Sequence, residues 1–131
     1  MINNPNKYII AFGPNPAWQK ALFFKKFTAG AINRAEEMQS FPSGKGVNFC
    51  RAAAQWNEFS TLLIQFAGGD TGKLLCAGLA EEKIEHRTIE AEFSTRTSVT
   101  CLCRTSQTMT EVIEPSHPLS AQAIEDFHRM L

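Results

Sequence analysis

Ser43-Gly44-Lys45-Gly46-Val47-Asn48 is the stretch of sequence that decides the fold. Its two glycines flank a lysine, and because glycine has no Cβ, the backbone there can approach a ligand closely. The following residues, Phe49–Trp56, are typical of a helix, whose free N–H groups and positive dipole end would face the same point. Lys45 and Asn48 lie three residues apart, so they share one face of that helix. A cation, an amide and bare N–H groups at one spot suit a phosphorylated polyol.

A nucleotide-binding P-loop is the nearest alternative, and the spacing excludes it. A P-loop requires a glycine, four further residues, Gly-Lys and then Ser or Thr. Here Gly46 follows Lys45, and Gln39 stands where the first glycine is needed. The second Gly-Lys pair, Gly72-Lys73, is followed by Leu74 and fails as well. The residues alone leave two interpretations of the stretch open: a turn that binds phosphate or polyol, and a turn that is purely structural.

The composition limits the class of protein. With 131 residues the chain is long enough for one domain with a core and too short for two. Thirteen basic and thirteen acidic residues cancel, and no basic run with interleaved aromatic residues is present, so we expect no nucleic-acid partner. No apolar stretch approaches the roughly 20 residues that span a bilayer, and the N-terminal residues lack the pattern of a signal peptide. We therefore expect a cytoplasmic protein without a membrane partner.

The cysteine and histidine spacings predict no metal site. Cys50, Cys76, Cys101 and Cys103 contain no Cys-x-x-Cys pair and no paired Cys/His spacing. Cys101 and Cys103 are two residues apart on an expected strand, so they point to the same face and resemble small buried apolar residues. None of the three histidines has a neighbouring nucleophile or carboxylate that would suggest a triad. No local group of residues supplies a general base with its supporting side chain, so the sequence shows no complete active site.

Two apolar runs, Lys7–Phe12 and Thr61–Ala67, predict buried strands of a parallel sheet. A helix over Lys45–Asn57 is expected between them. A second helix is expected from an Asp70 N-cap to about Lys83. Glu85–Phe93 is expected to contain a short edge strand. The succession of strand, helix, strand and helix indicates a βαβ unit and an α/β fold.

Three further segments differ from the buried runs. Ala17–Phe27 is apolar with interspersed lysines and is predicted to be a strand or a strand and turn. In Ile32–Phe41 the apolar residues recur every three positions, which fits a helix, but the flanking glycine and proline fit an extended segment equally well. Arg96–Arg104 alternates between apolar and polar residues, and Met109–Ile113 returns as its partner, which indicates an antiparallel flap. Arg96 is either a solvated edge residue or a fork-shaped phosphate clamp.

The spacing also predicts the apolar faces of two helices. In the helix after the glycine-lysine stretch, Phe49, Ala53 and Trp56 form one stripe. Ser120 is expected to cap a last helix, Ala121–Leu131. The apolar face of that helix consists of Ala123, Ile124, Phe127 and Leu131.

Five motifs in a fixed order resemble one family. They are Asn15-Pro16-Ala17, Ser43–Asn48, Gly68–Gly72, Thr95-Arg96-Thr97 and Thr110–Pro115. Their succession and intervals resemble the N-terminal part of the PfkB (ribokinase-like) carbohydrate kinases. Within that family the motifs are most similar to the hexose-phosphate kinases: 1-phosphofructokinase, tagatose-6-phosphate kinase and the minor 6-phosphofructokinase. The resemblance covers nearly the whole chain.

The resemblance implies a ribokinase-like α/β fold, in which an incomplete parallel sheet is flanked by helices and accompanied by a small β-sheet lid. Residues 1–131 would form the N-terminal portion of one such domain, with lid segments at about 20–41 and 96–113. This favours a strand for Ile32–Phe41. Members of the family cover the sugar with the lid and often dimerise through it, so we expect a homodimer through the lid.

The resemblance also implies roles in sugar-phosphate binding. Six residues are predicted to bind the substrate: Gln19, Gly44, Lys45, Gly46, Asn48 and Arg96. The two cations would bind the phosphate, and the other four would contact the sugar. Gln19 occupies the position of an acidic residue that grips sugar hydroxyls in the family; an amide can still hydrogen-bond, but it carries no charge. Ser43 replaces the first glycine of the family's Gly-Gly-Lys-Gly signature.

The implied function is sugar-phosphate binding as the N-terminal part of an ATP-dependent hexose-phosphate kinase. Fructose 1-phosphate, fructose 6-phosphate and tagatose 6-phosphate are the candidate substrates. The family's Gly-x-Gly-Asp motif, with the catalytic aspartate and the ATP site, lies near the C-terminus of its longer members and is not found in these 131 residues. ATP and Mg²⁺ are therefore expected as cofactors of the complete family enzyme, with neither bound by this chain alone, which is predicted to be inactive. A truncated, non-catalytic module that binds a sugar phosphate or dimerises is the alternative.

Overall fold

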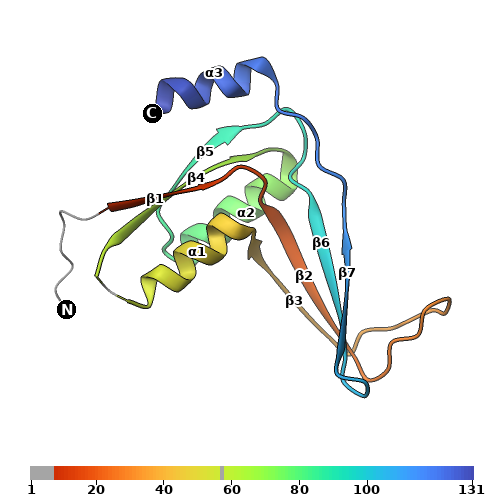
Figure 1. Cartoon of the computed structure of the whole chain (residues 1–131). Helices are drawn as coiled ribbons and strands as arrows, with labels where there is room; N and C mark the ends of the chain where they lie inside the picture. The colour runs from red at the N-terminus through yellow and green to blue at the C-terminus, as the bar shows by residue number, and fades with distance from the viewer. Residues whose placement is uncertain (1–7, 57) are drawn as a thin grey trace.

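A computed structural model describes residues 8–56 and 58–131, which form two sheets that meet at an angle (Figure 1). The first, which we call the body sheet, is parallel in the order β1–β4–β5. Its strands are β1 (Tyr8–Gly13), β4 (Ser60–Ala67) and β5 (His86–Glu90). Helices α1 (Lys45–Ala54) and α2 (Gly69–Glu81) lie on one face, and α3 (Ala121–Met130) lies on the other. The predicted α/β fold with a parallel sheet flanked by helices is confirmed.

The second sheet, which we call the lid, mixes both strand directions. Its strands are β2 (Ala17–Phe24), β3 (Glu37–Ser43), β6 (Thr97–Cys103) and β7 (Thr108–Ile113). In the order β3–β2–β6–β7, β2 runs parallel to β6, while β2 with β3 and β6 with β7 form antiparallel pairs. The lid extends away from the body, with the β2–β3 loop and the β6–β7 turn at its far end (Figure 1). The predicted second sheet and its β6–β7 hairpin are confirmed.

The body sheet carries the main core because helices cover both of its faces. Between this sheet and the helices α1 and α2 lies a cluster of eight buried residues: Ala11, Val47, Cys50, Leu63, Ala67, Leu75, Leu79 and Ile84. The other face buries a smaller cluster around Ile64, Phe66 and Ile89. Phe12 stacks there on Phe127 of α3, with ring centroids 4.8 Å apart. Strands covered on both faces have continuous apolar runs, which is why the sequence predicts them.

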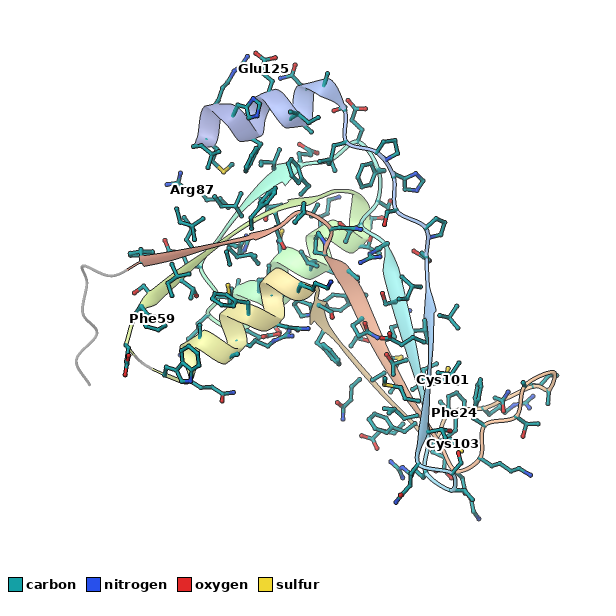
Figure 2. The ribbon with its side chains drawn as sticks, viewed as in Figure 1. Phe24, Phe59, Arg87, Cys101, Cys103 and Glu125 are labelled. Carbon is teal, nitrogen blue, oxygen red and sulfur yellow. The ribbon has the colours of Figure 1, made fainter. Side chains whose placement is uncertain are left out.

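The lid has a small core of its own at the end far from the body. Phe24, Cys101 and Cys103 are buried, and Figure 2 shows these three side chains gathered near the far end of the lid. The Phe24 ring centroid lies 5.3 Å from that of Phe27. The prediction that Cys101 and Cys103 are small buried residues is confirmed, and both are free thiols.

The strand β3 begins later than predicted, at Glu37 instead of Ile32, which is 83% exposed. A turn closed by the side chain of Asn33 occupies the segment before it. The Asn33 Oδ1 accepts from the N–H of Thr28 at 2.8 Å, and its Nδ2 donates to the Thr28 carbonyl at 2.8 Å. Gly30, with φ +77°, provides the left-handed residue that this turn requires.

The helix α1 presents a different face to the sheet than predicted. Phe49 and Trp56 are 43% and 65% exposed, so the predicted stripe is wrong for both. The buried face consists of Gly46, Val47, Cys50 and Ala53. Close contact with β1 sets this rotation: a Cβ on Gly46 would lie 2.8 Å from the Cα of Gly13 and 2.8 Å from Cδ1 of Leu63. Only glycine allows this approach of helix to strand.

The helix α2 lacks the predicted cap at Asp70. Gly68 is its N-cap, and Asp70 pairs instead with Lys73 at 3.2 Å. The hydroxyl of Thr95 accepts from the N–H of Gly68 at 3.1 Å. A Cβ on Gly68 would lie 2.2 Å from the carbonyl oxygen of Ala91, so the backbone is tightly packed at this point. These tertiary contacts fix the start of the helix and override the local capping pattern.

Ser120 caps α3 as predicted, because its hydroxyl accepts from the N–H of Ala123 at 3.1 Å. The apolar face is shifted from the prediction. The residues that pack on the body sheet are Ala123, Phe127 and Met130. Ile124 and Leu131, which were expected on this face, are exposed, since a stripe at 123, 127 and 130 places them on its flanks. Lys7 and Asn57, predicted ends of the first strand and first helix, lie outside the described residues.

Candidate functional site

A cleft of about 470 Å³ lies where the lid meets the body. Its lining comes from the end of β1 and the loop after it, the end of β3, the start of α1, and the strands β2, β6 and β7. Figure 1 shows the end of β1, the start of β2 and α1 coming together at the junction of the two sheets. The polar side chains of the lining are Asn15, Gln19, Ser43, Lys45, Asn48, Arg96, Ser98 and Glu111. Both sheets therefore contribute to a single concave site.

The start of α1 forms one wall of the cleft. Gly44 is the N-cap and has φ +128°, a conformation that residues with a side chain rarely adopt. The N–H of Asn48 donates to the Gly44 carbonyl at 2.9 Å as a first helical bond, and no side chain caps the helix start. Free N–H groups and the positive dipole end make this wall favourable for an anion.

Two cations, Lys45 and Arg96, line the cleft beside this helix start. The guanidinium of Arg96 donates to the carbonyl of Pro16 from Nε at 3.4 Å and to that of Asn15 from Nη2 at 3.2 Å. These bonds hold it against the loop after β1. Within the described part of the chain, neither cation pairs with a carboxylate. Their charge is therefore available to a bound anion.

Asn48 and Gly46 complete the predicted sugar-binding stretch on α1. The Oδ1 of Asn48 accepts from Nη1 of Arg51 at 3.0 Å, and Arg51 is itself held by an ion pair with Glu82. This bond orients the Asn48 amide at the edge of the cleft. Gly46 also lines the cleft, but its close contact with Gly13 is already sufficient reason for a glycine at this position.

Gln19 of β2 is linked to a carboxylate that is not among the six residues predicted to bind substrate. Its Nε2 donates to the hydroxyl of Thr100 at 2.6 Å, and that hydroxyl donates to Oε1 of Glu111 at 3.2 Å. Glu111 lines the cleft. The hairpin register pairs Thr100 with Glu111, so strand alternation was the signal that could have found it.

All six residues predicted to bind substrate line this one cleft: Gln19, Gly44, Lys45, Gly46, Asn48 and Arg96. Their contact with a substrate stays a prediction. In residues 8–56 and 58–131, no group of three or more His, Cys, Asp or Glu side chains is arranged to hold a metal ion. No helix in this part of the chain is long and apolar enough to cross a membrane.

The profile of the pfkB family carbohydrate kinases matches residues 17–128, which is most of the chain. The chain belongs to the pfkB family of carbohydrate kinases. The match includes the whole lid, the helices α1 and α2, and most of α3. The resemblance seen in the five ordered motifs is therefore confirmed.

Solved structures of phosphofructokinases share the fold of this pfkB chain. Phosphofructokinase-2 from Escherichia coli in complex with fructose 6-phosphate superimposes with a TM-score of 0.87 at 24% identity, covering 95% of this chain and 41% of that one. The tetrameric inhibited form of that enzyme gives 0.84 at 23% identity, with 95% and 40% covered. A possible 1-phosphofructokinase from Thermotoga maritima gives 0.84 at 23% identity, with 94% and 40% covered. The chain spans about 40% of the length of these structures, and the likeness confirms the predicted ribokinase-like fold.

Proposed function

We propose that this chain is the sugar-phosphate-binding part of an ATP-dependent hexose-phosphate kinase, with fructose 1-phosphate, fructose 6-phosphate and tagatose 6-phosphate as candidate substrates. The observation that carries the proposal is the convergence of Lys45, Arg96 and the uncapped start of α1 on one cleft. Membership of the pfkB family supports a sugar kinase. The similar phosphofructokinase-2 from Escherichia coli was solved with fructose 6-phosphate.

The cleft offers separate partners for the two halves of a sugar phosphate. Lys45 and Arg96 would bind the phosphate, and each charge-assisted hydrogen bond of this kind contributes about 1.5–3 kcal/mol. Gln19, Asn48 and Ser98 present neutral polar groups to the same space, which suits sugar hydroxyls. Its volume of about 470 Å³ falls in the range of small-molecule sites.

Phosphoryl transfer would need groups that the described residues do not supply. Glu111 is the one carboxylate that lines the cleft in residues 8–56 and 58–131, and no metal-holding cluster occurs there. We therefore propose that the 131-residue chain binds a sugar phosphate without transferring a phosphoryl group. Incubation with ATP, Mg²⁺ and each candidate substrate should yield no phosphorylated product. Product formation at a rate that Lys45→Ala abolishes would overturn this part of the proposal.

Calorimetric titration of the 131-residue chain with the three sugar phosphates tests the binding site. Lys45→Ala and Arg96→Ala should each weaken binding by about 1–3 kcal/mol, because each removes a cation from the phosphate. Lys73→Ala is the matched control: Lys73 is an exposed lysine of α2 outside the cleft, and its loss should leave affinity unchanged. Equal affinities in all four proteins, or no binding of any of the three sugar phosphates, would contradict the proposal.

We propose that the chain forms a homodimer through β7, one of the two outer strands of the lid. All six residues of β7 are exposed, among them the apolar Met109 and Val112. The competing surface is the edge strand β1, where Ile10 is exposed. Light scattering should show a dimer that Val112→Lys dissociates and Ile10→Lys does not. A monomeric chain would overturn the proposal, and dissociation by Ile10→Lys alone would move the interface to the body sheet.

A further inference from the structure

Glu111 has an unexpected place for a carboxylate, because the cleft otherwise favours anions. Among the described residues that line the cleft, Lys45 and Arg96 are the cations and Glu111 is the only acid. No ion pair within 4.0 Å joins Glu111 to either cation in this part of the chain. A site that bound phosphate alone would gain nothing from a fixed negative charge, which repels the ligand. The combination suits a ligand that carries both an anionic group and hydrogen-bond donors.

The hydrogen bonds behind Glu111 run in one direction only. A carboxylate can only accept, so the single hydroxyl hydrogen of Thr100 must point to Glu111. The Thr100 oxygen must then accept, which fixes Gln19 with its NH₂ group as the donor. Gln19 and Thr100 are only 7% and 8% exposed. Two buried side chains, Gln19 on β2 and Thr100 on β6, therefore hold the carboxylate of Glu111 on β7 through one oxygen, Oε1.

The second oxygen of the Glu111 carboxylate is unpaired within the described part of the chain. Oε2 makes no hydrogen bond to the residues that the structure describes, and Glu111 itself is exposed. A carboxylate oxygen is a strong acceptor for an O–H donor, and such charge-assisted bonds are about twice as strong as neutral ones. A sugar hydroxyl is an O–H donor, whereas the dianionic phosphate ester of a sugar phosphate has no O–H group.

We propose that Glu111 is the hydroxyl-recognising residue of the cleft, and that it makes the site select a polyol phosphate over a plain phosphate. The inference rests on the proposed sugar-phosphate site. Gln19 and Thr100 are positioning residues for Glu111. The amide at position 19 matters because a carboxylate there would compete with Glu111 for the one hydrogen of Thr100. Specificity in this cleft thus depends on the lid, while the phosphate is bound by α1 and Arg96.

The test compares Glu111→Gln with the unchanged chain. Glutamine keeps the shape and can still accept from Thr100, so the change removes the charge and turns one acceptor oxygen into an NH₂ donor. The probes are fructose 1-phosphate, fructose 6-phosphate, tagatose 6-phosphate and inorganic phosphate, measured by calorimetry and by the ligand-induced rise in Tm. Affinity for the sugar phosphate that binds tightest should fall at least about tenfold, the scale of a lost charged hydrogen bond. Affinity for inorganic phosphate should stay the same or increase.

Two further variants separate recognition from structure. Thr100→Val keeps the branched shape but removes the hydroxyl, and it should weaken sugar-phosphate binding in the same direction by a smaller factor. Glu114→Gln is the matched control, because Glu114 lies outside the cleft and accepts from the N–H of Thr97 at 2.7 Å. It should leave sugar-phosphate affinity unchanged.

The outcomes distinguish this inference from the proposed function. Unchanged sugar-phosphate affinity in Glu111→Gln, or an equal loss for inorganic phosphate, would overturn the role of Glu111 while leaving the phosphate site intact. An equal loss in Glu114→Gln would also overturn it, because the effect would then come from the hairpin as a whole. If the unchanged chain binds none of the three sugar phosphates, the proposed function fails, and this inference fails with it.

Discussion

The body sheet and the lid differ in the side chains that they mainly bury, although Gln65 of the body strand β4 is a fully buried polar residue. Beneath α1 and α2 the body buries a large apolar cluster in which Leu63 and Leu75 are fully enclosed. The lid buries hydrogen-bonding residues near the cleft, Gln19, Ser98 and Thr100, beside its small far-end core. Apolar burial is the main source of folding free energy, whereas buried polar groups fix geometry. We therefore expect stability to reside mainly in the body, and the proposed ligand selection to depend on the lid.

Leu75→Ala should produce the largest effect on stability. The side chain is fully buried in the core beneath α2, and its truncation should lower the free energy of unfolding by about 2–5 kcal/mol. Ile32→Ala in the lid is the matched control, since Ile32 is highly exposed and its truncation should change this free energy by less than about 0.5 kcal/mol. Urea denaturation measures both. Equal effects would break the distinction between a stabilising body and a recognising lid.

A smaller effect is the pH dependence of the free energy of unfolding, which we expect in a different pH range for the body and for the lid. In the body, burial lowers the pKa of His86 below its ordinary 6.5. In the lid, hydrogen bonds from Ser106 and from the N–H of Phe27 lower the pKa of the Cys103 thiol from 9.0 to about 7. Both groups bind fewer protons when folded, so both stabilise the fold more as pH rises. The His86 contribution is present above pH 6.5 and is lost at lower pH; that of Cys103 is lost between pH 9 and 7.

Unfolding free energies measured across pH 5–9 can test these windows one at a time. In His86→Asn the difference from the unchanged chain should vary below pH 6.5 and be constant above it. In Cys103→Ser the difference should vary between pH 7 and 9. A Cys103→Ser difference that is flat across that interval would show that folding does not lower the pKa of the Cys103 thiol.

The body strands could be predicted from sequence because their signal is local. Apolar runs such as Thr61–Ala67 are typical of strands that are buried on both faces of a sheet, so they predict strands at these positions. The start of α1 at Lys45 was likewise visible, since Gly44 and the helix formers after it are neighbours in sequence. The cap of α3 at Ser120 depends on a residue three positions away, and it was predicted correctly.

The remaining features depend on contacts between distant residues, which no local pattern contains. The rotation of α1 is set by the packing of Gly46 on Gly13. The N-cap of α2 is set by the contact of Gly68 with Ala91. Glu111 reaches the cleft only through the parallel pairing of β2 with β6, whose partners lie about 80 residues apart. The six candidate site residues came from family resemblance, and their spacing alone did not decide between a binding turn and a structural one.

The most direct measurement is an amide NMR titration of the 131-residue chain with fructose 6-phosphate, fructose 1-phosphate and tagatose 6-phosphate in turn. If the cleft is a sugar-phosphate site, at least one of them should shift the amide signals of Gly44, Lys45 and Asn48 together with those of Arg96 and Glu111, and the shifts should saturate. Signals of α3 should stay in place. No saturable shift with any of the three, or shifts confined to residues outside the cleft, would contradict the account.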